Sequence, residues 1–272
     1  MNDLVNMSYL DARDWYARWY LPNNAFVVVI GDVRADVVFA LAQKYYGRIK
    51  ARPLPGRKPQ TEPEQRGVRR LTVKAPAELP YLLMGWKCPV LRDVDKDWQP
   101  YALEILAGVL DGNESARLNQ SLVRNSRLAS EAGASYDPTA RGPGMFFIEG
   151  TPSQGRSVDD LEAGLRAEVA RLVQEGVSAD ELARVKAQLV ARQVFKRDSI
   201  FGQAMEIGRF ETAGLSYRDI DRVQERIRAV SAEQVRDVAQ QFLVDDQLTL
   251  VALDPQPLKQ AQARPAPPGM RH

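Results

Sequence analysis

Histidine and cysteine, the residues that most often carry out catalysis or bind zinc, are almost absent from this sequence. The single histidine is His272, the last of 272 residues, and the single cysteine is Cys88. A zinc site needs three or four clustered ligands, and no HExxH, HxxEH or CxxC motif occurs. The sequence therefore excludes a zinc site and a His-based catalytic centre, and it predicts no catalytic and no metal-binding residue in this chain.

The remaining acidic pairs and the lone thiol have structural explanations. Asp159 and Asp160 follow Ser157 at the spacing of a helix start, and Asp245 and Asp246 lie in a predicted turn. Cation binding by either pair is the alternative. Cys88 ends an apolar run and has no histidine to activate its thiol, so we expect a small structural residue.

One arginine could contact a ligand. Arg141 lies in a turn-rich link, Asp137–Gly144, between two predicted strands, and Phe146 and Phe147 follow it closely. A guanidinium held in such a turn could donate two parallel hydrogen bonds to a peptide carbonyl or a carboxylate. A solvated turn arginine is the alternative. The glycines of this link lack a following Lys-Ser/Thr pair, so they do not form a phosphate-binding loop.

Hydrophobic periodicity predicts the elements that must position these residues. An unbroken apolar run, Ala25–Ile30, is typical of a strand buried on both faces. Further strands are predicted at 68–73, 81–86, 128–136, 145–150 and 248–253, and helices at 10–19, 37–45, 98–110 and 115–123. The last third is helical, and Ser157, Ser178 and Ser231 each precede an acid or amide by three residues, as at helix N-caps.

Two details of the first helices are also predicted. The aromatic stripe Trp15, Tyr16, Trp19 and Tyr20 recurs at helical spacing, which favours a core position over a ligand groove. Gly47 follows the second helix, where a left-handed cap would lie.

The overall composition limits the classes of partner. With 37 basic and 35 acidic side chains the net charge is +2, so no strong field attracts nucleic acid or an anionic membrane. No apolar run reaches the roughly 20 residues of a membrane-spanning helix. Strands mixed with helices, followed by several helices, predict an α+β fold: a mixed sheet backed by helices on one face, in a two-layer sandwich.

Several motifs, in order and spacing, resemble the second, non-zinc domain of pitrilysin/insulinase-type (inverzincin) zinc peptidases, which include the mitochondrial processing peptidase. They are Trp15–Ala25 followed by Val27–Val33, Lys44–Gly47 with Ile49, and Leu110–Arg124 followed by Leu128–Ala129. The resemblance covers about Asp11 to Asp254. It implies a LuxS/processing-peptidase-like sandwich over residues 9–254, with residues 1–8 as a linker from a missing zinc domain and 255–272 as a loose, Pro-rich tail.

The resemblance also implies a function. The first domain of such a peptidase supplies HxxEH and binds zinc, while the second domain is one wall of a chamber that holds an extended peptide. This chain would then be inactive by itself, and its parent a periplasmic metalloendopeptidase that works as a homodimer or as a heterodimer with a related half. The alternative is a non-catalytic partner or scaffold subunit that binds peptide or a catalytic sibling.

In that family an arginine and a tyrosine, six or seven residues apart, hold the substrate backbone over the zinc. Arg141 matches the arginine, but Phe147 stands where the tyrosine is expected. A phenylalanine keeps an apolar wall and loses the hydroxyl donor. The substrate-binding residues implied for this chain are therefore Arg141 and Phe147. Either this pair binds the substrate backbone more weakly than the family's arginine and tyrosine, or a partner half supplies the tyrosine.

Overall fold

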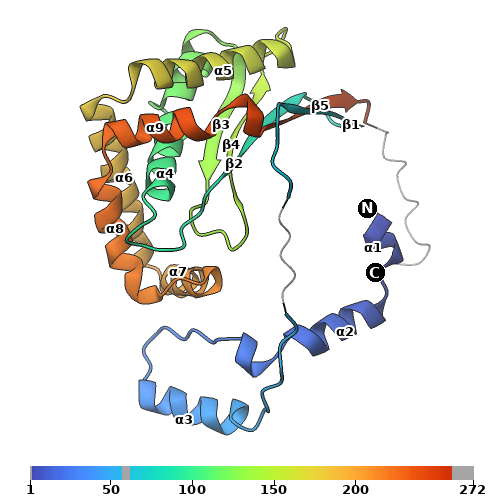
Figure 1. The fold of residues 1–272 in the computed structure, drawn as a ribbon, viewed down its shortest axis with the longest axis vertical. Helices are drawn as coiled ribbons and strands as arrows, with labels where there is room; N and C mark the ends of the chain where they lie inside the picture. The colour runs from blue at the N-terminus through green and yellow to red at the C-terminus, as the bar shows by residue number, and fades with distance from the viewer. Residues whose placement is uncertain (1, 57–61, 259–272) are drawn as a thin grey trace, which may run out of the picture. The chain divides into compact units, whose positions relative to one another are not determined.

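A computed structural model of the chain describes residues 2–56 and 62–258 (Figure 1). It divides into two compact units. The first comprises residues 1–64 with 195–209, and the second comprises residues 65–194 with 210–272. His272 and most of the predicted tail lie outside the described residues.

The second unit is built on a five-stranded mixed sheet. Its strands, in the order β1-β5-β2-β4-β3, are β1 (Arg69–Pro76), β5 (Leu248–Gln256), β2 (Tyr81–Cys88), β4 (Gly144–Pro152) and β3 (Ala129–Tyr136). β1 runs parallel to β5, and the other neighbours are antiparallel. These strands confirm the predictions at 68–73, 81–86, 128–136, 145–150 and 248–253.

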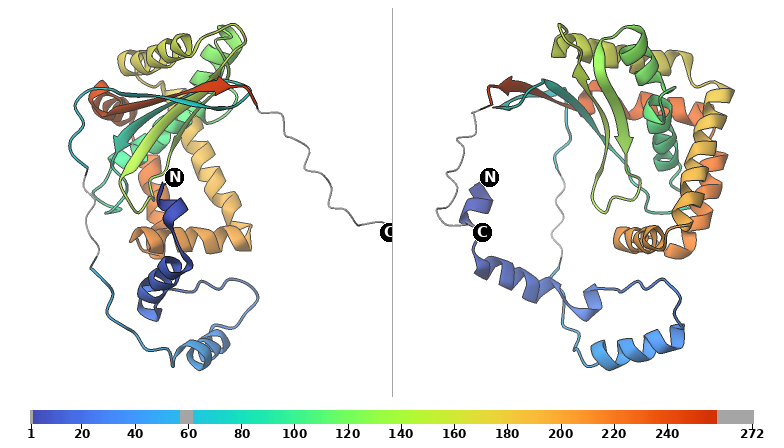
Figure 2. Two further views of the ribbon diagram at one scale, coloured as in Figure 1. Left: turned by 90° about the vertical axis from the view of Figure 1, so that its right-hand side faces the viewer. Right: turned by 180° about the vertical axis from the view of Figure 1, so that it is seen from behind.

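Helices cover one face of this sheet. α4 (Gln99–Asp111) packs on β3, α5 (Val158–Glu175) on β4, and α9 (Ala232–Phe242) on β2 and α4, as Figure 1 and the two views of Figure 2 allow the reader to follow. Further helices are α6 (Ala179–Arg197), α7 (Ile200–Ala213) and α8 (Ile220–Ala229); the end of α6 and most of α7 fall within residues 195–209, which belong to the first unit. The predicted α+β sandwich, with a mixed sheet backed by helices, is confirmed.

Side chains of alternating burial define the two faces of the sheet. Along β4 the residues facing the helices, among them Phe146 and Ile148, are fully buried, and their neighbours are half-buried. Leu82, Met84 and Trp86 of β2 share the helix side of the sheet. The core therefore lies between the sheet and the helices, and the opposite face of the sheet has no helix packed on it among the described residues of this unit.

The predicted helix starts are confirmed, because each depends on contacts only three residues apart. The hydroxyl of Ser157 accepts the Asp160 backbone N–H at 3.0 Å, and that of Ser231 accepts the Gln234 backbone N–H at 3.1 Å. Ser178 accepts in the same way from Glu181, at 3.2 Å. Such caps satisfy N–H groups that have no partner in the first turn of a helix.

The helix predicted at 115–123 is shifted. The structure has a π-helical segment at Asn119–Asn125, ended by a bond from the Ser126 N–H to the Ser121 carbonyl, five residues back. The Ser121 hydroxyl also donates to the carbonyl of Arg117 at 2.7 Å. A serine that bonds back to the preceding turn distorts a helix, which gives a physical reason for the irregular winding.

Besides residues 195–209, which include most of α7, the first unit contains α1 (Asn2–Asn6), α2 (Tyr9–Trp19), a 3₁₀ turn at Pro22–Asn24 and α3 (Ala35–Tyr46). The strand predicted at Ala25–Ile30 is wrong for this structure: the segment forms no strand, and Val27 is 70% exposed. The described residues of this unit form no β-strand, so the backbone N–H and C=O groups of Ala25–Ile30 have no neighbouring strand to pair with.

Two further predictions about this unit are wrong. Trp15, Tyr16 and Tyr20 are exposed rather than core residues, and Trp19 is half-buried. The rings of Tyr16 and Tyr20 stack on each other at 4.5 Å. Among the described residues of the same unit, no sheet lies under this helix to bury them. Gly47 has φ −62°, so α3 ends without a left-handed cap.

Candidate substrate-binding face

Phe147 lies on the uncovered face of the sheet, on interior strand β4. In the register of the strands Phe147 pairs with Gly85 of β2 on one side and with Ser135 of β3 on the other. Paired residues of antiparallel strands point to the same face. We call this surface the open face; its central strands contribute Tyr81, Leu83, Gly85 and Lys87 from β2 and Met145, Phe147, Glu149 and Thr151 from β4.

The ring of Phe147 lies against bare backbone. A β-carbon added to Gly85 would come within 3.1 Å of the Phe147 ring and 2.9 Å of the Met145 methyl group. Gly85 therefore leaves the space that these two side chains occupy. The ring remains half-buried, so part of its apolar surface is open to solvent.

A tyrosine and a glutamate adjoin this apolar surface. Burial, together with the nearby Glu149 carboxylate, raises the pKa of the Tyr81 hydroxyl. Asp111, at the end of α4, accepts the Ala134 backbone N–H of edge strand β3 at 3.2 Å, and burial raises its pKa. The open face thus combines exposed apolar atoms with fixed hydrogen-bonding groups.

Arg141 is exposed in the loop between β3 and β4. Within the described residues its guanidinium has no hydrogen-bond or ion-pair partner, whereas its backbone is tightly held. The guanidinium of Arg92 donates to the carbonyls of Ala140, Arg141 and Gly142 at 3.0, 2.8 and 3.0 Å. This contact, which we call the Arg92 clamp, fixes the loop and leaves the Arg141 side chain available.

The loop is anchored at its first residues too. The Asp137 carboxylate accepts the N–H and the hydroxyl of Thr139 at 2.9 and 2.8 Å, which closes a local turn. The Pro138 carbonyl accepts the Leu91 N–H at 2.9 Å. Sequence reasoning missed Arg92, because its partners lie 48 to 50 residues further along the chain.

The structure separates the two phenylalanines that follow Arg141. Phe146 points to the helix side, where it is fully buried and stacks on Tyr136 at 6.2 Å. Only Phe147 reaches the open face. Arg141 and Phe147 come from adjacent parts of one hairpin, Arg141 from its loop and Phe147 from β4.

The other candidates have structural roles. Asp245 pairs with Arg166 at 2.6 Å, Asp246 accepts the Gly67 N–H at 3.0 Å, and Asp160 caps α5. Burial raises the pKa of the Cys88 thiol to about 12, so the thiol stays protonated near neutral pH.

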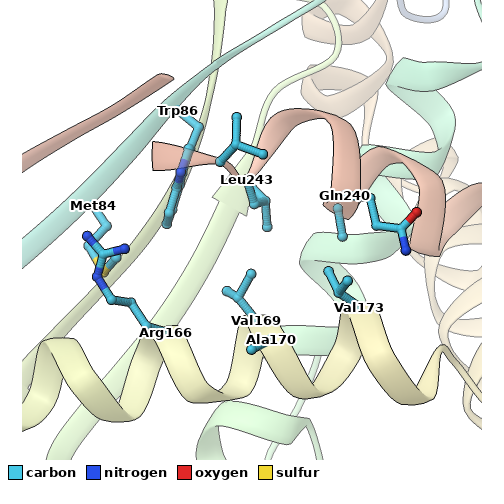
Figure 3. Close-up of a pocket in the computed structure, with 10 residues that line it drawn as sticks. Met84, Trp86, Arg166, Val169, Ala170, Val173, Gln240 and Leu243 are labelled. Carbon is cyan, nitrogen blue, oxygen red and sulfur yellow. The ribbon is translucent and has the colours of Figure 1, made fainter. Parts of the chain in front are cut away.

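A separate groove of about 410 Å³ lies between α5 and α9 over β2 (Figure 3). Its wall is mostly apolar, with Met84, Val169, Val173 and Leu243, and the Trp86 ring N–H has no hydrogen-bond partner among the described residues. Arg166 at its rim is already bound by Glu162 and Asp245.

The described residues do not provide ligands for the zinc that the resemblance implies. Across residues 2–56 and 62–258, no three His, Cys, Asp or Glu side chains lie close enough together to bind a metal ion. These residues do not fit a zinc site, so no chemical step through zinc is derived for this chain. None of the described helices is long and apolar enough to cross a membrane.

Comparisons with known proteins agree with this fold. The chain is 27% identical over 264 residues to the zinc protease PqqE of Helicobacter pylori, and the match covers 94% of this chain and 57% of PqqE. A solved protease from Helicobacter pylori superposes with a TM-score of 0.86 at 24% identity, covering 94% of this chain and 61% of that one. The chain thus spans a little over half the length of these relatives.

A shorter structure is also similar. The inactive peptidase domain of a putative zinc protease from Bordetella parapertussis matches with a TM-score of 0.60 at 18% identity, covering 71% of this chain and 99% of that domain. The family model described as "Peptidase M16 inactive domain" matches residues 6–189. These matches confirm the resemblance to the non-zinc domain of pitrilysin/insulinase-type peptidases, and the chain belongs to the peptidase M16 inactive domain family.

Proposed function

We propose that this protein is the non-zinc part of a zinc-dependent endopeptidase and that its open face forms one wall of a chamber for extended peptides. Zinc would be bound by a domain outside this chain, and this chain by itself would not cleave peptides. The observation that carries the proposal is the position of Phe147: a partly exposed aromatic ring on interior strand β4, on a sheet face with no helix packed on it among the described residues of its unit.

The chemistry of the open face supports peptide binding. An extended peptide presents side chains and backbone amides alternately, so it needs apolar surface and fixed polar groups at short intervals. Phe147 and Met145 supply apolar surface, and the Glu149 carboxylate, near Tyr81, supplies an acceptor for an amide N–H. These groups come from rigid strands, which lowers the entropy lost on binding.

Arg141 supplies the complementary donor. Its loop is held by the Arg92 clamp, so the backbone needs no ordering when a ligand binds. A guanidinium can donate two parallel hydrogen bonds to a peptide carbonyl or to a carboxylate. We therefore assign Arg141 and Phe147 as substrate-binding residues.

The test uses the complete parent protein loaded with zinc and a quenched fluorescent peptide. Arg141→Ala is expected to lower kcat/KM by about 10-fold or more, the loss of about 1.4 kcal/mol or more of binding to a charged donor. Zinc content, measured by atomic absorption, should not change. Arg156→Ala, an exposed arginine in the turn after β4, is the matched control and should behave as wild type. Unchanged kinetics for Arg141→Ala would reduce Arg141 to a surface residue.

A second candidate function follows from the missing hydroxyl at Phe147. A subunit that lacks the tyrosine donor could bind peptide, or a related catalytic half, without taking part in cleavage. The same assay separates the two: cleavage by the zinc-loaded parent with no partner added contradicts the scaffold function. Assembly as a homodimer or heterodimer and a periplasmic location belong to this proposal and rest on the resemblance.

A further inference from the structure

The segment that connects β2 to α4 contacts both the loop of Arg141 and helix α8. We call residues 89–98 the bridging segment; in Figure 1 it runs from the end of β2 toward α8 before α4 begins. On one side, Arg92 of the bridging segment forms the Arg92 clamp on the loop. On the other side, two arginines of α8 bind Asp95. Whatever holds this segment in place therefore also determines where the clamp lies.

Two more hydrogen bonds join the bridging segment to the hairpin formed by β3 and β4. The Leu91 N–H donates to the carbonyl of Pro138 at 2.9 Å, and the Tyr136 hydroxyl donates to the carbonyl of Pro89. The Leu91 side chain is buried. Because these contacts add to the three bonds of the Arg92 clamp, the segment and the loop are expected to shift together when either is displaced.

Side chains of the bridging segment close a compact turn within it. One oxygen of the Asp97 carboxylate accepts the backbone N–H groups of Arg92 and Asp93, both at 2.8 Å. The Asp93 carboxylate in turn accepts the N–H of Asp95 at 3.0 Å and that of Lys96 at 3.3 Å. Side chains that bond to nearby backbone in this way fix a turn without regular secondary structure. A displacement of Asp95 is therefore passed to the backbone of Arg92.

Helix α8 provides a firm support for Asp95. Arg222 and Arg226 lie four residues apart, hence on one side of the helix, and both donate to the Asp95 carboxylate, Arg226 at 2.8 Å. The helix is anchored by Val223 and Ile227, whose side chains are buried. The two arginines follow Asp95 by 127 and 131 residues, so only the fold brings them to it. A carboxylate bound by two guanidinium groups of a packed helix has a well-defined position.

A separate contact limits how much depends on Asp95. The hydroxyl of Tyr101 in α4 donates to the carbonyl of Val94 at 3.0 Å, and the Val94 side chain is buried. Loss of the Asp95 contacts should therefore loosen the turn without unfolding the segment. Half-exposed ion pairs also contribute only modestly to global stability. The expected effect is on the position of Arg92, and not on the stability of the fold.

We propose that Asp95 is a positioning residue for the substrate-binding loop. Its contacts with α8 fix the bridging segment, and through the Arg92 clamp this segment fixes the loop of Arg141. This role rests on the proposed function, because that function assigns a peptide to Arg141. The effect of Asp95 on turnover should pass through the Arg141 side chain. A residue with a purely structural role would affect turnover in an Arg141 variant as well.

Limited proteolysis of the 272-residue chain measures the loop independently of any peptidase activity. Trypsin should cut between Arg141 and Gly142 about 5-fold faster in Asp95→Asn than in wild type, because the amide lacks the charge that both arginines bind. Asp95→Glu keeps the charge and should restore most of the protection. Asp219→Ala is the matched control: it removes an aspartate that pairs with Arg222 at 2.7 Å, leaves the Asp95 contacts in place and should not change the rate. A wild-type rate for Asp95→Asn, or equal acceleration by the control, would overturn the proposal.

A double-mutant cycle on the complete, zinc-loaded parent protein tests whether Asp95 acts through Arg141. Asp95→Asn should lower kcat/KM for a quenched fluorescent peptide by about 3-fold, because a small displacement of a binding group lowers turnover even when the loop stays closed. In the Arg141→Ala background the same change should have no further effect, since residues that act through one another are not additive. No loss in wild type, or an equal loss in both backgrounds, would overturn the proposal. If Arg141→Ala alone leaves kcat/KM unchanged, the proposed function fails, and the trypsin rates still decide whether Asp95 fixes the loop.

Discussion

Replacing Arg92 by alanine is expected to loosen the loop that presents Arg141. The Arg92 guanidinium donates hydrogen bonds to three consecutive carbonyls of this loop, at 2.8 to 3.0 Å. A charged donor with good geometry contributes about 1.5–3 kcal/mol per hydrogen bond when it is buried. At a solvent-exposed loop, screening and competition with water reduce this value to roughly 0.7 kcal/mol each.

The three bonds together then contribute about 2 kcal/mol to keeping the loop closed, which corresponds to roughly a 30-fold change in the opening equilibrium. Cleavage by trypsin after Arg141 measures this equilibrium, because a protease cuts a structured loop only in its open form. The Arg92→Ala chain should be cut between Arg141 and Gly142 about 30-fold faster than wild type, with the fragments quantified by mass spectrometry.

Arg156→Ala controls for the loss of a surface arginine and should leave the rate of this cut unchanged. Arg92→Lys keeps the charge but cannot bridge three carbonyls, so it should show most of the increase. A cleavage rate within two-fold of wild type for Arg92→Ala would refute the reasoning, since the loop would then be held without the clamp.

Three further predictions concern stability and reactivity. Arg117→Ala should lower the free energy of unfolding by about 3 kcal/mol in urea titrations, because it leaves the nearly buried Glu181 without its two-point partner; a loss below 1 kcal/mol would contradict this. Burial holds the folded pKa of Asp111 above its unfolded value of 3.8, so ionising this group costs the folded state extra free energy as pH rises through that range. Asp111→Asn keeps an acceptor for the Ala134 N–H. The free energy of unfolding of this variant, compared with that of wild type, should therefore be higher at pH 7 than at pH 3; the same difference at both pH values would contradict the prediction. Cys88 should react with a thiol reagent only after denaturant is added, because its thiol is buried and protonated; rapid labelling of the folded chain would show otherwise.

Local patterns in the sequence determined the elements whose hydrogen bonds close within a few residues. The starts of α5 and α9 were predictable because Ser157 and Ser231 cap them through contacts three residues apart. The strands of the second unit were predictable from the spacing of apolar residues. The near absence of histidine and cysteine likewise determined that this chain does not supply the usual ligands of a zinc site.

Tertiary structure decided everything that depends on a distant neighbour. Trp15 and Val27 are apolar residues of the kind usually found in a core, yet both are exposed. Their burial would require a sheet, and the described part of their unit contains none. Arg92 is one of many arginines in the sequence, and only the fold brings its guanidinium to the loop of Arg141. Alternation put Phe146 and Phe147 on opposite faces, but the position of the helices decided which of the two remained open to a ligand. A sequence records which residues favour burial or pairing, and the chain topology determines which of them find a partner.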